Sequence, residues 1–134
     1  MSVRDKLSVT HYRGGIEFDI EEHSPDRVVA RMPVAPGMLN PFGTVHAGAM
    51  IWFADIAATL CAIGDPATVD DTGRGFPLAV DLHTVLAGNR RDGTLTATAR
   101  PVKRGKAMTV IRTEVTAEDG TLLISLTSTH VAAR

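Results

Sequence analysis

Residues 47–64, AGAMIWFADIAATLCAIG, contain a single charged residue, Asp55, in 18 positions. A membrane-spanning helix needs about 20 mostly apolar residues, and a charge at the bilayer centre costs at least ~2.5 kcal/mol. The central position of Asp55 and the Gly and Ala content therefore favour a helix buried inside a folded domain over a membrane span. We expect this helix to cover residues 46–62. Because it is apolar on all sides, other elements must surround most of it.

The segments on both sides of this helix have the patterns of β-strands. Residues 16–22 alternate apolar and acidic side chains, and a Ser-Pro-Asp turn joins them to a second strand at 27–34, which predicts a hairpin. A short amphipathic helix is expected within residues 2–12. After the apolar helix, turn sequences separate four further strand-like segments, at residues 78–87, 94–102, 106–117 and 122–131.

Six strands and one central helix predict an α+β architecture for a single domain of residues 1–134. One curved antiparallel sheet of about six strands can wrap around a helix that is about 25 Å long and cover its apolar surface. In the last strand, Leu122, Ile124 and Leu126 are expected to share one face of the sheet. Such a sheet has open edges, and pairing with another copy of the chain satisfies them. We therefore expect a homodimer or a dimer of dimers, which would be a homotetramer.

The composition excludes several classes of function. The chain has 134 residues, a formal net charge of −1, 4% aromatic residues and one cysteine. Binders of nucleic acid are basic overall or stack bases on aromatic side chains, so nucleic acid is not expected as a partner. A single cysteine excludes a disulfide scaffold, and the N-terminus lacks the apolar core of a signal peptide, so we expect a cytoplasmic protein. The five histidines lie far apart in the sequence, so we expect neither a metal site nor another cofactor.

A carboxylate and a hydroxyl group share one face of the apolar helix. Asp55 is the only charge in that helix, so another group must compensate it. Thr59 lies four residues further on and therefore on the same face, where the two side chains can share a bound water or a substrate atom.

The start of the helix offers a second set of candidate groups. Around His46, Ala47 and Gly48 the backbone N–H groups are unpaired, and the helix dipole favours negative charge. An oxyanion or a polarised carbonyl oxygen can be held at such a position, and Gly48 is a candidate for contact with a substrate. Asn40 in the preceding loop completes the set, and the co-occurrence of these residues favours a functional site over separate capping and turn roles.

The run Asn40-Pro41-Phe42-Gly43-x-x-His46-x-Gly48, with an acid nine residues after the histidine, resembles the hotdog-fold acyl-CoA thioesterases. It is similar to the branch that holds the phenylacetate-pathway thioesterase and one type of 4-hydroxybenzoyl-CoA thioesterase. The order of strands and helix also fits that family over most of the chain. The resemblance implies a hotdog fold and hydrolysis of an acyl- or aryl-CoA to the free acid and CoA.

The same resemblance implies a role for each matching residue. Asp55 corresponds to the catalytic carboxylate, as nucleophile or as general base on water, and Thr59 to a hydroxyl that orients the water or the carboxylate. Asn40 corresponds to a residue that holds the water or the acyl group, and His46 to one that positions groups near the thioester. The N–H of Ala47, where the family usually has glycine, polarises the thioester carbonyl. In this family the carboxylate and that N–H come from opposite subunits.

Basic residues gather in the second half of the chain and provide a candidate site for CoA phosphates. Residues 90–112 contain seven Lys or Arg and one acid. The turn Arg104-Gly105-Lys106 falls where the resembled family binds the nucleotide end of CoA. Glycine lets the backbone approach a phosphate closely, and Arg and Lys supply positive charge. Arg90 is a further candidate for this site.

Two other functions remain open for the same fold. A hotdog hydratase or dehydratase of acyl thioesters carries its histidine and acid in different arrangements, which are not seen here. A non-catalytic acyl-CoA-binding hotdog protein is disfavoured by the complete set of candidate residues. Phe42 and Trp52 are candidates for lining an acyl pocket, but they do not distinguish an aromatic acyl group from a short or long aliphatic one.

Overall fold

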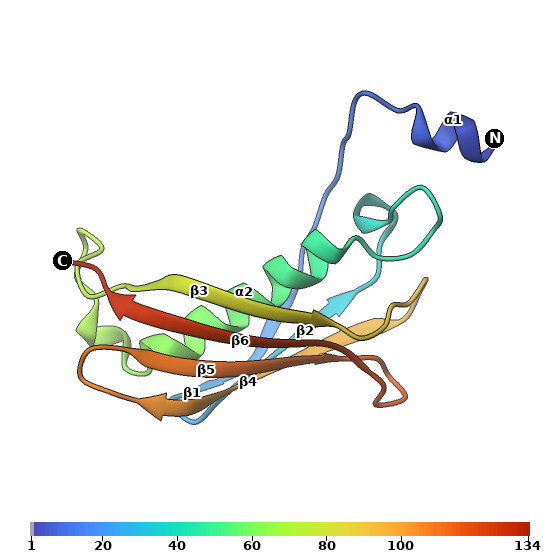
Figure 1. Ribbon diagram of the computed structural model, residues 1–134. Coiled ribbons are helices and arrows are strands. Elements are labelled where there is room, and N and C mark those ends of the chain that lie inside the picture. The colour runs from blue at the N-terminus through green and yellow to red at the C-terminus, as the bar shows by residue number, and fades with distance from the viewer. Residues whose placement is uncertain (1) are drawn as a thin grey trace.

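The computed structural model describes residues 2–134, which form one six-stranded sheet and one long helix (Figure 1). All strand pairs are antiparallel, in the order β1-β2-β4-β5-β6-β3. The predicted α+β class and the hotdog architecture are therefore confirmed. No helix within residues 2–134 has both the length and the apolarity needed to span a membrane. The elements are α1 Val3–Leu7, β1 Asp19–Ser24, β2 Arg27–Pro33, η1 Pro36–Met38, α2 Ala47–Ile63, η2 Pro66–Thr68, β3 Pro77–Leu86, β4 Thr94–Arg104, β5 Thr109–Thr116 and β6 Leu122–Ala132.

Small side chains let α2 lie close to the sheet. Its buried residues are mostly alanine, with Met50, Phe53 and Cys61 as the larger members. The facing strands β2 and β4 bury three further alanines among larger apolar side chains; their buried residues are Val28, Ala30, Met32, Leu95, Ala97 and Ala99. The predicted buried helix is thus confirmed, with one difference: Trp52 remains 40% exposed, because the sheet covers one side of α2 and leaves the other side open.

The N-terminal segment differs from the prediction. Only Val3–Leu7 is helical, and none of these residues is buried, because the arm that carries α1 extends away from the sheet (Figure 1). The first strand begins at Asp19 rather than at residue 16, and a register shift between Ile20 and Glu22 interrupts its alternation. Ile16 and Ile20 are consequently exposed, contrary to the expected apolar face.

The prediction of which β6 residues share the buried face is also partly wrong. Ile124 and Leu126 are buried as expected, but Leu122 is exposed and Leu123 is buried in its place. The cause is a register shift between Val115 and Thr116 of β5, opposite the start of β6. An extra residue in a ladder reverses the face of the side chains before it.

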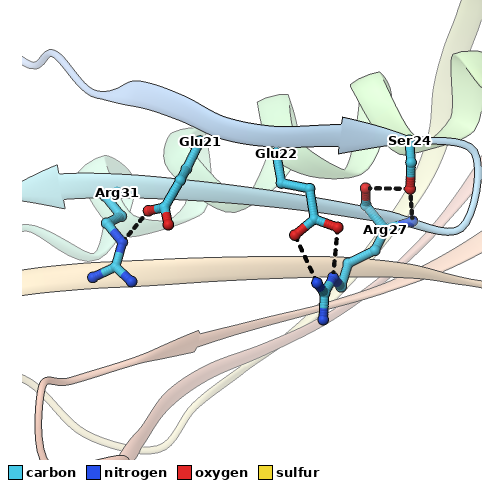
Figure 2. A network of polar contacts seen from close by, with 5 residues as sticks. All are labelled: Glu21, Glu22, Ser24, Arg27 and Arg31. Carbon is cyan, nitrogen blue, oxygen red and sulfur yellow. Dashed lines mark hydrogen bonds and ion pairs between the residues drawn. The ribbon is translucent and has the colours of Figure 1, made fainter.

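The β1–β2 hairpin carries a network of polar side chains (Figure 2). The Arg27 guanidinium donates two hydrogen bonds to Glu22, of 3.0 and 2.7 Å, and Arg31 pairs with Glu21. Ser24 Oγ accepts from the Arg27 N–H and donates to its carbonyl, which closes the turn. The charged partners are about half exposed, so these pairs contribute little to the free energy of folding.

Arg104 stabilises the C-terminal end of α2. Its guanidinium donates to the carbonyls of Cys61, at 2.8 Å, and Ala62, at 3.3 Å, and also to that of Pro25 in the hairpin turn. The last carbonyls of a helix lack internal partners and carry partial negative charge, so a cation is favourable there. These three acceptors engage part of the guanidinium of Arg104, the residue for which the resemblance implies contact with CoA phosphates.

We expect Arg104→Met to lower the free energy of unfolding by about 1.5 kcal/mol, the lower end of the range for hydrogen bonds to charged groups. Lys106→Met is the matched control, because Lys106 lies exposed in the same turn and forms no hydrogen bond or ion pair within residues 2–134. Its effect should stay within about 0.5 kcal/mol. Urea unfolding followed by circular dichroism measures both, and equal effects of the two variants would contradict the capping role.

Candidate active site

Asp55 lies in the middle of α2. The residue is half-buried, and its Oδ1 is fully buried without a hydrogen-bond partner among the described residues. Near the C-terminal end of the helix, His23 Nε2 of β1 donates to the Leu60 carbonyl at 3.0 Å. Thr59 follows Asp55 by one turn and is also half-buried. The helix thus presents the carboxylate and the hydroxyl on one side, as the spacing predicts.

The start of α2 leaves backbone donors free. His46 is the N-cap residue; its side chain does not cap the helix, and its carbonyl accepts from the N–H groups of Ala49 and Met50. The N–H groups of Ala47 and Gly48 take part in no hydrogen bond that the structure describes. An added Cβ at Gly48 would meet nothing within 4 Å, so this position is open to a ligand. These two N–H groups can polarise a carbonyl oxygen.

Asn40 organises the loop before the helix. Its Oδ1 accepts from the N–H groups of Phe42, at 2.9 Å, and Thr44, at 3.2 Å, while its Nδ2 donates to Thr44 Oγ1 at 2.6 Å. The sequence predicts that Asn40 holds a water or an acyl group. The structure places both of its polar atoms in the loop itself, which leaves one amide hydrogen for a ligand.

Asn89, which the sequence analysis did not single out, anchors the same loop to the sheet. Its side chain accepts from the Val45 N–H at 3.1 Å and donates to the Val45 carbonyl at 2.7 Å. An amide side chain can donate and accept in this way from one planar group. Because Val45 precedes His46, Asn89 helps to position the free N–H groups at the start of α2. Its signal in the sequence was weak, since a lone Asn after a Gly is typical of any turn.

The remaining candidate residues are dispersed. Trp52 packs edge-on against Phe18, with ring centroids 5.1 Å apart, and Phe42 is 46% exposed beneath the Lys6 ammonium. Arg90 pairs with Asp119 at 3.2 Å and donates to the Asn89 carbonyl at 2.8 Å. Gly105 closes the β4–β5 turn through its N–H and the Met108 carbonyl. The structure therefore does not bring Arg90 and Arg104 together at one anion site.

Lys106 lines an open cavity of about 710 Å³ between the segment after α2, the β4–β5 turn and the C-terminus. Arg74 and Arg134 line it as well, and Asp70 is the one acid in its wall. Three cations therefore surround one hollow. Neither basic partner of Lys106 was predicted: Arg74 lies in the loop before β3, and Arg134 follows β6.

Two other types of site find no support in the described part of the chain. Within residues 2–134 no three His, Cys, Asp or Glu side chains come close enough to hold a metal ion. Cys61 is buried, and burial raises the pKa of its thiol, against the lowering effect of the Arg104 charge. A protonated, buried thiol is not a nucleophile.

A buried pair on β6, Ser128 and His130, was not predicted, because a lone histidine in a strand has no distinctive pattern.

Known proteins resemble the chain over nearly its whole length. The family described as "Domain of unknown function (DUF4442)" matches residues 7–131. A protein of Bacillus subtilis (strain 168) named "Putative esterase ComA2" is 30% identical over 106 residues, which cover 79% of this chain and 81% of the relative.

Solved structures show the same fold. The thioesterase enzyme SAV0944 from Staphylococcus aureus subsp. aureus Mu50 has a TM-score of 0.78 and 28% identity, over 89% of this chain and 95% of that one. Two of its structures are variants, one altered at a glutamine and one at a glutamate fifteen residues later. A hypothetical thioesterase from Streptococcus pneumoniae TIGR4, solved with coenzyme A, has a TM-score of 0.76 over 87% of this chain and 86% of that one, but its 20% identity shows the fold alone. The chain therefore belongs to the DUF4442 family of hotdog-fold proteins, whose solved relatives include thioesterases.

Proposed function

We propose that this protein is an acyl-CoA thioesterase that hydrolyses the thioester with Asp55 and the free N–H groups at the start of α2. The observation that carries the proposal is a lone, partly buried carboxylate on the same apolar helix whose N-terminal donors are unused. The S. aureus thioesterase supports the pair of residues, because its altered glutamine and glutamate have the same fifteen-residue spacing as Asn40 and Asp55.

The chemistry requires a nucleophile and an oxyanion donor on one carbonyl carbon. Asp55 either removes a proton from the attacking water or attacks the carbonyl itself; in the second case water then hydrolyses the acyl anhydride. The Ala47 N–H donates to the oxygen that gains negative charge in the transition state. The C–S bond then breaks, and the products are the carboxylic acid and the CoA thiol. Thr59 is placed to orient the water or the carboxylate.

The geometry of one chain argues for a site shared between two subunits. Ala47 and Asp55 are eight residues apart on α2, which is about 12 Å along the helix axis. Both groups must lie about 3 Å from the reacting atoms, so they cannot serve the same carbonyl within one chain. The outer strand β3 provides a means of association, because its outer edge is unpaired and five of its apolar side chains are exposed, namely Leu78, Val80, Leu82, Val85 and Leu86. Pairing of this edge with a second copy brings two α2 helices into one dimer.

The basic cavity beside Lys106 suits the phosphates of CoA. Asp55 is eight residues from the end of α2, about 12 Å along its axis, and the extended pantetheine arm of CoA spans such a distance. Lys106, Arg74 and Arg134 then supply the positive charge that the phosphates require.

We expect Asp55→Asn to reduce kcat/KM for acyl-CoA hydrolysis by at least about 10²-fold, because the amide neither removes a proton nor attacks the carbonyl. The melting temperature should not fall, since the buried Oδ1 has no partner to lose. Asp71→Asn, at an exposed loop position, is the matched control. A thiol-release assay over short, long and aromatic acyl-CoAs measures these rates. Unchanged turnover in Asp55→Asn would refute the assignment, and tight acyl-CoA binding without thiol release would favour a binding protein.

Complementation tests the shared site. Ala47→Pro removes the N–H of the first helical residue, where proline is well tolerated, and His46 already has the extended backbone (φ −57°, ψ 133°) that precedes proline. Ala47→Pro and Asp55→Asn should each be inactive alone. After subunit exchange at equal amounts, half of the dimers are mixed and each has one intact site, so about a quarter of the wild-type activity should return. No recovery from exchanged dimers would show that each site lies within one chain.

Lys106→Met should raise KM for acyl-CoA about five- to tenfold and leave KM for an acyl-N-acetylcysteamine thioester unchanged, because the second substrate lacks the nucleotide. Lys103→Met is the control, since Lys103 is exposed on β4 and does not line the basic cavity. Equal changes for both substrates would place the phosphates elsewhere.

A further inference from the structure

The N-terminal arm, residues 2–18, runs from α1 to β1 past the start of α2 and borders an open cavity there (Figure 1). The cavity has a volume of about 440 Å³. Three segments form its wall: residues 12–16 of the arm, Gly37 and Met38 of η1, and His46, Gly48 and Ala49 at the start of α2. Because Gly48 directly follows Ala47, the cavity begins beside the N–H group that we assign to the thioester carbonyl.

Three glycines hold the arm in its place beside the helix. The Gly15 N–H donates to the Gly37 carbonyl at 3.0 Å. A Cβ at Gly14 would lie 2.9 Å from the Gly37 oxygen, and a Cβ at Gly37 would lie 2.9 Å from the Gly15 nitrogen and oxygen. These distances are shorter than real Cβ contacts, so the two backbones can approach this closely only because glycine has no side chain. Apolar burial does not fix the arm here, since residues 12–16 are all exposed.

The wall of this cavity is suited to an apolar group. Met38 and Ala49 are 1% and 2% exposed, and Ile16 is 37% exposed although its side chain is apolar. No Asp or Glu lines the cavity, and its volume falls within the range of about 300–1,000 Å³ that is typical of small-molecule sites. Phe42 and Trp52, which the sequence predicts for an acyl pocket, do not line it.

We propose that this cavity binds the acyl group of the substrate and that residues 12–16 of the arm select a medium-length aliphatic or single-ring aromatic acyl group. The inference rests on the proposed function, because a carbonyl held by the Ala47 N–H must direct its acyl group into a neighbouring space. An added Cβ at Gly48 would meet no atom within 4 Å, so the way from that carbonyl into the cavity is open. Each methylene that the cavity buries favours binding roughly fourfold.

Gly48→Leu tests where the acyl group lies, because it fills the entrance of the cavity and keeps the backbone N–H. The melting temperature should not fall, since the new Cβ has free space and leucine favours a helix more than glycine does. In the wild-type protein, we expect kcat/KM for octanoyl-CoA and for benzoyl-CoA to exceed that for acetyl-CoA at least about tenfold. Both ratios should fall at least about tenfold in Gly48→Leu, because the acetyl group is too short to use the cavity.

Thr10→Leu is the control for this variant, since Thr10 is exposed on the same arm and does not line the cavity. Its ratios should equal those of the wild-type protein. Unchanged ratios in Gly48→Leu would place the acyl group elsewhere and leave the thioesterase assignment intact. Absence of thiol release from the wild-type protein with every acyl-CoA would overturn both.

Protection from trypsin gives a readout without turnover. Trypsin cleaves after Arg13, in the wall of the cavity, and after Lys6, which does not line it. In Asp55→Asn, octanoyl-CoA should slow cleavage after Arg13 at least about threefold and leave cleavage after Lys6 unchanged. Equal slowing at both bonds, or none after Arg13, would show that the acyl group does not contact the arm.

A matched pair of glycine variants tests how the arm is held. Gly14→Ala should speed cleavage after Arg13 and lower the ratio of octanoyl-CoA to acetyl-CoA hydrolysis, because its Cβ displaces the arm from the Gly37 carbonyl. Gly15→Ala should leave the cleavage rate unchanged, since its Cβ meets nothing within 4 Å. Equal cleavage rates in the two variants would contradict the role of the glycine contact in placing the wall.

Discussion

Close contact between an almost uncharged helix and a sheet of small side chains constrains the rest of this structure. The alanines of α2 meet Ala30, Ala97 and Ala99 of the strands, which leaves little space for water or for long side chains. Any polar group placed at this interface must therefore find a partner among a few neighbours. Asp55 is such a group, and its buried Oδ1 has no hydrogen-bond partner among the described residues.

The two ends of α2 differ in whether the chain itself supplies hydrogen-bond partners for their terminal backbone groups. At the C-terminal end, Arg104 binds carbonyls that would otherwise lack partners. At the N-terminal end, Asn40 and Asn89 hold the preceding loop but leave the first N–H groups unoccupied. The C-terminal carbonyls are thus bound by the chain itself, whereas the first N–H groups remain available to a ligand.

The fold could be predicted from the sequence because its signals are local and repeated. The apolar stretch around Asp55 and the turn sequences between strands are enough to define the helix and the order of strands. The wrong predictions of strand faces lie at register shifts, near Ile20 and before Leu123. Whether a strand slips by one residue depends on its pairing with the neighbouring strand, and the sequence of the strand itself does not indicate it.

Residues of the candidate site were predicted where they share the helix. Asn89 was not, because its contacts with Val45 join positions far apart in the sequence. The capping role of Arg104 could not be predicted either, because a basic turn has no local signal for the helix end that it contacts.

The burial of Cys61 has a consequence for an enzyme that releases a thiol at every turnover. Free CoA forms mixed disulfides with accessible protein thiolates under oxidising conditions. The chain has one cysteine, and it lies in the interior of α2 with a raised pKa. The chain therefore offers no accessible thiolate to the thiol product that we propose it generates.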